Sequence, residues 1–182
     1  MRKNEAKYNQ VENKELTADI VGMTAVKVQD MAGKRINNYQ FDWNRMLSFE
    51  GDTGPYLQYN HVRLCSVERR VAQTDGVELP PSPLDMSTIR LDLITEPKAR
   101  EVIMLLASWP DIVKAAMKDF QPSTVVQYCF KLTHAVASAW EVIIVKNQEK
   151  DLALARLMMY RSARNVLGAA LQLLTIPPLQ RM

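Results

Sequence analysis

Apolar residues recur at helical spacing along most of the chain, beginning near the N-terminus. Leu16, Ile20 and Met23 predict a helix over roughly residues 2–31, with a candidate break at Val21-Gly22. Within this stretch, residues 25–29 (AVKVQ) fit a helix or a short strand, and their periodicity does not separate the two. The N-terminal region is therefore expected to be mainly helical.

The segment Thr53-Gly54-Pro55 marks the start of a second helix. Thr53 can cap free amide groups, and Pro55 costs little in a first turn because its missing N–H has no partner there. This helix is expected to reach about Ala72 and to turn four side chains to the core: Leu57, Val62, Leu64 and Cys65. Gly76 and the Pro-rich residues 80–83 then predict an exposed loop.

Prolines also mark the starts of three later helices. We expect helices from Pro97 to about Ala107, from Pro110 to about Asp119, and from Pro122 to about Val145. Asn147 is expected to cap a final helix that ends near Leu174, in which Gly168 indicates close packing against a neighbouring helix. The predicted fold is all-α, an antiparallel helical bundle.

The composition is that of an ordinary globular protein with a helix-rich core. The 182 residues are 47% hydrophobic and 24% charged, enough for one domain with an appended fragment. Cys65 and Cys129 share no metal-ligand spacing and are expected to be reduced, buried thiols. Neither a secretory signal nor an apolar run of membrane-spanning length is visible, so we expect no membrane partner.

The net charge of +3 is concentrated at one end of the chain. Residues 151–182 carry the whole excess, and their cations are Arg156, Arg161, Arg164 and Arg181. Arginine forms bidentate bonds with phosphate and stacks on bases, so this cluster suits RNA, although a solvated helix face would carry the same charge pattern.

Several segments resemble arginyl-tRNA synthetases. Residues 48–59 read SFEGDTGPYLQY, similar to the joint between the catalytic module and the anticodon-binding bundle, and residues 41–47 read FDWNRML, similar to the family's FDWDRAL. Residues 151–156 (DLALAR) and 160–164 (YRSAR) resemble the helix that gives the DALR-type anticodon-binding domain its name. The ending PPLQRM at residues 177–182 is similar to the family's terminus. The resemblance spans almost the whole chain and is most like fungal or animal-type sequences.

This resemblance implies a division of the chain and a function. Residues 1–50 would be the stem-contact tail of a class I catalytic module, and residues 51–182 the anticodon-binding helical bundle. The implied partners are arginine tRNA, whose central anticodon C is an identity element, and the missing N-terminal catalytic module. No DNA partner is implied. The expected compartment is the cytoplasm, with the mitochondrion as an alternative.

The sequence lacks the motifs of amino-acid activation. Class I synthetases use a HIGH motif and a KMSKS-type loop, but the only histidines here, His61 and His134, stand in no HIGH-like setting and no KMSKS run occurs. The resemblance implies ATP and Mg²⁺ for the intact arginine–tRNA ligase. We expect no cofactor, metal or catalytic residue in this fragment, which alone is predicted to be inactive.

Aromatic residues are the first candidates for contact with unpaired bases. Tyr56 and Tyr59 lie three residues apart near a predicted helix start, where free amides and the helix dipole attract phosphate. Tyr56 is predicted to contact RNA and Tyr59 to pack inward. Trp140 stands where relatives carry an aromatic residue, and it fits either base stacking or the core. Met182 matches the family's terminal Met, which approaches the anticodon loop.

The remaining candidates are basic or lie beside basic residues. Arg156, Arg161 and Arg164 fit contacts to RNA phosphates, which position RNA without reading its sequence. Arg156 fits equally an ion pair with Asp151 or Glu149, and Tyr160, four residues later, is predicted to line the same groove. His134 lies in an apolar run and is expected in the core, whereas the position of His61 is left open.

A different class of function also fits the sequence. A synthetase fragment retained as a protein-interaction bundle, or simply inert, would expose the face of residues 1–50 that packs on a catalytic module. An independent enzyme on a helical bundle has no nucleophile, base and acid set to support it.

Overall fold

The computed structural model describes residues 11, 13–80 and 88–182 of the chain. Every secondary-structure element in these residues is a helix, which confirms the predicted all-α class. The elements are α2 (Lys14–Met31), the short α3 (Trp43–Met46), α4 (Gly54–Asp75), the 3-10 turn η2 (Leu91–Leu93), α5 (Pro97–Asp119), α6 (Pro122–Ala139) and α7 (Lys150–Leu173). The helix predicted for residues 2–10 and the proline-rich loop at 81–83 lie outside the described residues.

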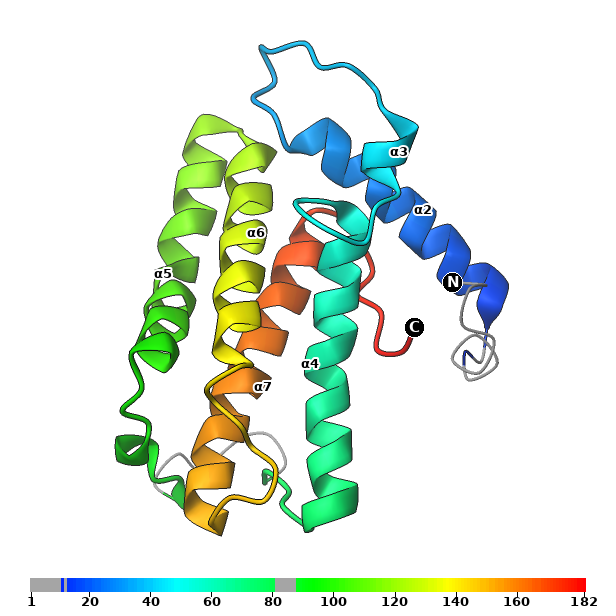
Figure 1. Cartoon of the computed structure of the whole chain (residues 1–182). Coiled ribbons are helices and arrows are strands. Elements are labelled where there is room, and N and C mark those ends of the chain that lie inside the picture. Colours follow the sequence, from blue (N-terminus) through cyan, green and yellow to red (C-terminus); the bar gives the residue numbers. More distant parts are fainter. Residues whose placement is uncertain (1–10, 12, 81–87) are drawn as a thin grey trace.

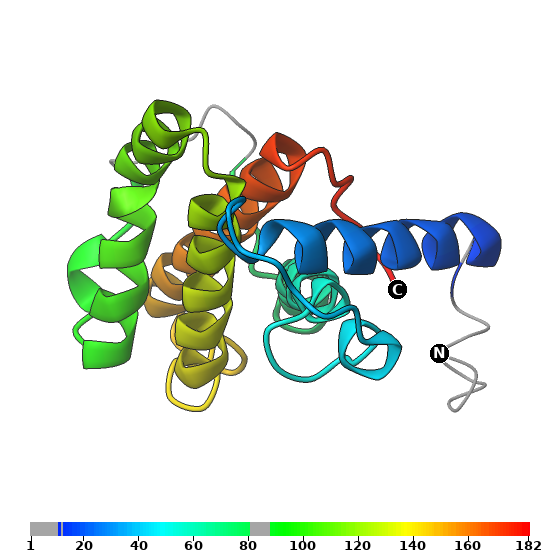
Figure 2. The same ribbon diagram turned by 90° about the horizontal axis from the view of Figure 1, so that it is seen from above.

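Four long helices form the antiparallel bundle, and α2 crosses one end of it. Figure 1 shows α4, α5, α6 and α7 side by side, and Figure 2, seen from above, shows α2 lying across the end of α4. Helix α2 continues through Gly22 without a break, and residues 25–29 are helical. The segment after α2, which includes α3, then leads back to the start of α4.

The start of α4 is fixed by a cap and by contact with α2. The Thr53 side chain accepts a hydrogen bond from the Tyr56 amide at 3.3 Å, and Pro55 stands in the first turn, as predicted. A Cβ placed on Gly54 would lie 2.5 Å from the backbone oxygen of Thr24. Because a side chain has no room there, only glycine allows the two backbones to approach this closely.

Helix α5 contradicts the predicted break at Pro110. One helix runs from Pro97 to Asp119 with Pro110 inside it, so the two predicted helices are one. A proline in a helix leaves carbonyls of the preceding turn without their usual partner or displaces them. The Leu105 carbonyl accepts hydrogen bonds from the Ser108 hydroxyl at 2.7 Å and the Tyr128 hydroxyl at 3.0 Å. These hydroxyls bind the carbonyl next to that of Leu106, which loses its usual partner at Pro110, and Tyr128 ties this turn of α5 to α6.

The connection between α6 and α7 also differs from its prediction. Helix α6 ends at Ala139 rather than near Val145, and Glu149, not Asn147, caps α7 with its side chain. Asn147 instead adopts a left-handed conformation (φ 57°), and its amide donates to the Asp75 carboxylate at 2.8 Å. The loop is held by buried side chains, among them Ile143 and Val145.

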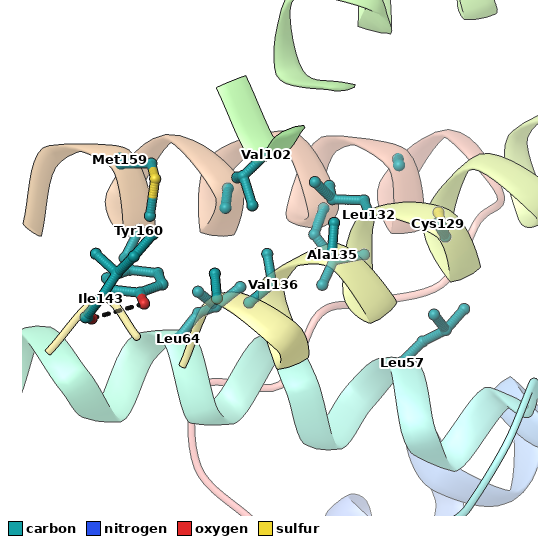
Figure 3. Close-up of a cluster of buried hydrophobic side chains, with 14 of the residues drawn as sticks. Leu57, Leu64, Val102, Cys129, Leu132, Ala135, Val136, Ile143, Met159 and Tyr160 are labelled. Carbon is teal, nitrogen blue, oxygen red and sulfur yellow. Dashed lines mark hydrogen bonds between the residues drawn. The ribbon is translucent and has the colours of Figure 1, made fainter. Parts of the chain in front are cut away.

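The core lies between α4, α5, α6 and α7. Figure 3 shows Leu57 and Leu64 of α4 facing Leu132, Ala135 and Val136 of α6, with α7 behind them. Cys65 and Cys129 are buried and unpaired with each other, as predicted. Gly168 packs as expected, because a Cβ there would lie 3.0 Å from the His61 ring.

No helix in the described ranges is both long enough and apolar enough to span a membrane.

Candidate nucleic-acid interface

One face of α4 carries aromatic and basic side chains that point outward. Tyr56, Tyr59, Arg63 and Arg70 follow one another at spacings of three, four and seven residues, which places them on one side of the helix. Tyr59 is 44% exposed, which contradicts the inward packing predicted for it, and Arg63 and Arg70 are exposed. Tyr56 is half-buried at the start of this face.

Tyr56 packs against His134 of α6. Their ring centroids are 6.0 Å apart with an interplanar angle of 88°, and His134 Nε2 lies 2.9 Å from an Asp52 carboxylate oxygen. The core position predicted for His134 is therefore wrong. Its side chain is 56% exposed because this position of α6 faces the start of α4 rather than the packed interior.

Trp140 is held between a buried tyrosine and an arginine. Its ring stacks on Tyr160 of α7, with centroids 4.2 Å apart and an angle of 14°, and the Arg63 guanidinium lies 4.8 Å from the Trp140 centroid. A cation over an indole face is attracted by the ring's quadrupole. Trp140 is half-buried, so it packs against the core on one side and stays accessible for base stacking, the two roles predicted for it.

The Trp140 indole N–H points away from solvent. Its Nε1 atom is buried and finds no hydrogen-bond partner among the described residues, so it does not offer a donor to a base edge. Trp140 therefore offers its aromatic surface and the arginine that lies over it, but no hydrogen-bond donor.

Tyr160 supports this stack from inside the core. It is 1% exposed, and its hydroxyl donates to the Ile143 carbonyl at 2.9 Å (Figure 3). Burial raises the pKa of Tyr160, so the phenol stays a donor at neutral pH. Since no face of Tyr160 is open, any effect it has on RNA acts through Trp140.

Arg156 forms an ion pair with Glu96, which stands just before α5, rather than with Asp151 or Glu149. It also donates to the Ile144 carbonyl at 2.6 Å, and its side chain is 12% exposed. Burial alone raises the pKa of the Glu96 carboxyl, but backbone amides and Arg156 outweigh that effect and leave the pKa below its ordinary value. The guanidinium thus ties the α6–α7 loop to the start of α5.

Arg161 and Arg164 converge on Glu68 of α4. Arg161 also donates to the Pro80 carbonyl at 3.0 Å, and Arg164 to the Asn165 side chain at 3.0 Å. Glu68, Arg161 and Arg164 line an open groove of about 670 Å³ between α4 and α7. Two of the three arginines predicted to contact phosphate therefore already share one carboxylate.

The C-terminal tail lies against α4. His61 is 5% exposed beneath it, and its Nδ1 atom donates to the Leu179 carbonyl at 2.7 Å in the tautomer this contact requires. Arg69 donates to the Gln180 carbonyl at 3.2 Å. Met182, the last residue, is half-buried. The tail thus continues along the helix that carries the outward-facing tyrosines and arginines.

Sequence reasoning missed Arg63, Arg69 and Arg70. Arg63 lies four residues after Tyr59, a spacing that places both on one helix face, and this pattern was visible in the sequence. The contacts of Arg69 depend on the path of the tail. Nowhere in the described ranges do three His, Cys, Asp or Glu side chains gather as metal ligands would.

Two family models match the chain. The model described as "DALR anticodon binding domain" matches residues 57–182, and the model described as "tRNA synthetases class I (R), catalytic domain" matches residues 1–43. Together they support the resemblance found in the sequence.

Whole-chain relatives are arginine–tRNA ligases. The chain is 51% identical over its full length to "Probable arginine--tRNA ligase, cytoplasmic" of Schizosaccharomyces pombe, and covers 28% of that protein. It is 44% identical over its full length to "Arginine--tRNA ligase, mitochondrial" of Saccharomyces cerevisiae, and covers 27% of it. The chain thus spans less than a third of the length of these relatives.

The fold also matches a solved synthetase. The Thermus thermophilus arginyl-tRNA synthetase aligns with a TM-score of 0.82 and 25% identity, over 98% of this chain and 29% of that one. The helical bundle and α2 therefore have a counterpart in a part of a larger protein.

Proposed function

Because the chain belongs to the DALR anticodon-binding family of the arginyl-tRNA synthetases, we propose that it binds the anticodon stem-loop of arginine tRNA. The observation that carries the proposal is the Arg63–Trp140–Tyr160 stack beside the exposed Tyr59. Such a cluster offers flat surfaces and positive charge together, as single-stranded RNA requires.

The stack suggests how an unpaired base is held. Tyr160 covers one face of Trp140 and Arg63 the other, so a base stacks on the outer side of Arg63 or displaces it from the indole. Tyr59 and Tyr56 offer further stacking surfaces one and two turns earlier on α4, and Arg70 lies where it can meet a phosphate. Met182 is proposed to approach the same loop from the tail.

The three arginines of α7 already form ion pairs within the protein. Arg156 and Arg161 donate to Glu96, Glu68 and backbone carbonyls, so their first role is to hold the loops around α7. A phosphate contact from Arg156, Arg161 or Arg164 stays a prediction, and it requires these ion pairs to open or to be shared.

The second proposed partner is a class I catalytic module. Large apolar side chains are exposed along α2 and the segment up to α4: Leu16, Met23, Val26, Ile36, Tyr39, Phe41, Trp43, Leu47 and Phe49. Exposed apolar surface of this kind marks a contact site, and residues 1–43 match the catalytic family model. ATP and Mg²⁺ would act in that module, and this chain would place the tRNA for arginine–tRNA ligase activity.

The names of the relatives give two different compartments. We propose the cytoplasm, which the S. pombe relative's name gives, and keep the mitochondrion as the alternative named for the S. cerevisiae relative.

Titration of the purified chain with arginine tRNA at about 50 and 200 mM salt tests the proposal. Binding that weakens with salt, and exceeds binding to a tRNA for another amino acid, is expected. Equal affinity for both tRNAs would leave only a basic helical surface. No binding at low salt, together with self-association through the exposed face of α2, would favour a protein-interaction bundle, and inertness in both assays would favour a non-functional fragment.

A further inference from the structure

The C-terminal tail is fastened to α4 by buried polar contacts rather than by apolar packing alone. After α7 ends, Thr175 adopts a left-handed conformation (φ 59°) and the chain turns back, so that the tail runs beside α4 (Figure 1). Ile176 is buried at the turn. From Thr175 to Gln180, three or more tail carbonyls and the Leu179 amide are bound by side chains of α2 and α4.

Gln58 is the centre of these contacts. It has no exposed surface, and its side-chain amide donates to the Pro177 carbonyl at 2.9 Å while its oxygen accepts from the Leu179 amide at 2.9 Å. A glutamine amide can satisfy a backbone carbonyl and a backbone N–H at once, as a neighbouring strand would. The tail is thereby held in one register.

Thr24 of α2 fixes the orientation of this amide. The second N–H of Gln58 donates to the Thr24 hydroxyl at 3.0 Å, and that hydroxyl donates in turn to the Ile20 carbonyl at 2.6 Å. If the amide were turned over, its oxygen would face the Pro177 carbonyl and its N–H groups the Leu179 amide, and both bonds would be lost. Lys27 adds a second link from α2, donating to the Thr175 carbonyl at 2.7 Å.

The register set by Gln58 decides where the end of the tail lies. Just beyond it, His61 binds the Leu179 carbonyl and Arg69 binds the Gln180 carbonyl, while Arg69 also donates to Ser66 at 3.4 Å. Ser66 stands one turn after Arg63 on α4. Helical spacing places Gln58, His61 and Arg69 on a different side of α4 from Tyr59 and Arg63. The tail therefore runs along the flank of α4, and Ser66 lies between the two sides.

We propose that Gln58 is a positioning residue for RNA binding, which acts by holding the C-terminal tail, and with it Met182, in register along α4. This inference rests on the proposed function, because the tail matters to RNA only if Met182 approaches the anticodon loop as proposed. Gln58 itself is buried and touches no RNA. Its substitution is expected to weaken binding through the tail alone.

A double-mutant cycle on the 182-residue chain tests this inference. Gln58→Met keeps the side-chain length and removes the amide, and a second variant ends the chain at Leu179. Freeing the tail is expected to raise the Kd for arginine tRNA about tenfold, the cost of ordering a few side chains again on binding. Each variant alone should show this loss, and the combination should lose no more than either one.

Hydrogen exchange supplies the readout that does not depend on RNA. The Leu179 amide, which Gln58 binds, is expected to exchange at least about tenfold faster in Gln58→Met, because its bond opens locally rather than with the whole fold. Thr24→Val removes only the orienting hydroxyl at nearly constant volume, and should give a smaller change in the same direction. It serves as the test if Gln58→Met does not fold.

Two outcomes overturn the inference. Additive losses of tRNA affinity in the cycle would show that Gln58 acts outside the tail, and unchanged exchange at Leu179 would show that Gln58 does not hold it. If the wild-type chain binds no tRNA at low salt, the proposed function fails together with the RNA role of Gln58. The exchange rates still decide whether Gln58 fastens the tail.

Discussion

Trp140 lies flat on Tyr160, with the ring centroids 4.2 Å apart and an angle of 14° between the rings. The tyrosine comes from α7 and the tryptophan from the end of α6, so this contact fixes an aromatic residue at the surface by means of one in the core. The Tyr160 hydroxyl, bonded to the Ile143 carbonyl, ties the α6–α7 loop to the same point.

Tyr160→Phe should separate stability from RNA binding. The change removes one buried hydrogen bond and leaves the Ile143 carbonyl unpaired, so the free energy of unfolding is expected to fall by about 1–2 kcal/mol. The ring stack remains and no stacking energy is lost, so tRNA affinity should stay within about twofold of the wild type. Urea denaturation and a tRNA titration measure the two effects. Tyr160→Leu, which removes the stack, should weaken RNA binding, and unchanged binding there would count against the role of Trp140.

Arg63→Ala is expected to weaken tRNA binding about tenfold, in the range found for stacked or phosphate-bound cations. If Arg63 meets a phosphate, the dependence of log Kd on log salt should also fall by about one. Arg63→Lys keeps the charge but loses the planar guanidinium, so its tRNA affinity should lie between those of the wild type and Arg63→Ala. Arg100→Ala on α5, also an exposed arginine, is the matched control and should bind like the wild type. Equal losses at Arg63 and Arg100 would contradict the assignment of the α4 face.

Glu68→Gln should destabilise the fold. The carboxylate is shared by Arg161 and Arg164, and all three side chains are largely buried, so a loss of about 1–3 kcal/mol in unfolding free energy is expected. Glu101→Gln is the control, because its pair with Lys98 is half exposed and exposed pairs contribute only about 0.2–1 kcal/mol. Chemical denaturation of both variants gives the comparison. Equal stability of Glu68→Gln and the wild type would mean that the two arginines hold nothing in place.

The stability of the fold should fall as the solution becomes mildly acidic. Burial lowers the pKa of His61, with the nearby Arg164 adding to the effect and the Leu179 carbonyl opposing it. The unfolded chain therefore binds a proton more readily than the folded chain, so unfolding becomes easier as the pH drops below the ordinary histidine value of about 6.5. His61→Asn keeps a donor near the Nδ1 position and should flatten the stability profile between about pH 7 and 5.5. An identical slope in this variant would assign the effect elsewhere.

The purified chain should not charge tRNA. Its sequence has no HIGH motif or KMSKS-type loop, so incubation with arginine, ATP, Mg²⁺ and tRNA is expected to yield no arginyl-tRNA. Any charging above a protein-free control would show that the chain carries an activation site.

The all-α fold and most helix starts could be predicted because they depend on local chemistry. Thr53 caps α4 and Pro122 opens α6, since a cap and a first-turn proline act within a few residues. Pro110 misled the same rule. Whether a proline ends a helix depends on tertiary contacts around it, and here this part of α5 packs on α6, where Trp109 stacks on Tyr128.

The side-chain environments were harder to predict because they depend on tertiary contacts. His134 and His61 show this clearly: the one in an apolar run is exposed, and the other is covered by a tail 118 residues further along the chain. Arg161 and Arg164 meet Glu68 from another helix, which charge counting along the chain does not reveal. Helical spacing alone places Tyr59 and Arg63 on one side of α4. That this side faces outward depends on the packing of α4, which is why the inward position predicted for Tyr59 was wrong.

The most direct measurement of the central claim uses the isolated anticodon hairpin of arginine tRNA. Its affinity for this chain is compared at about 50 mM salt with that of the same hairpin in which the central base is replaced. We predict that the original hairpin binds at least about tenfold more tightly, since losing a matched pair of hydrogen bonds to a base edge costs roughly 1–3 kcal/mol of discrimination. Equal affinity of the two hairpins would contradict the claim that this bundle reads the anticodon of arginine tRNA.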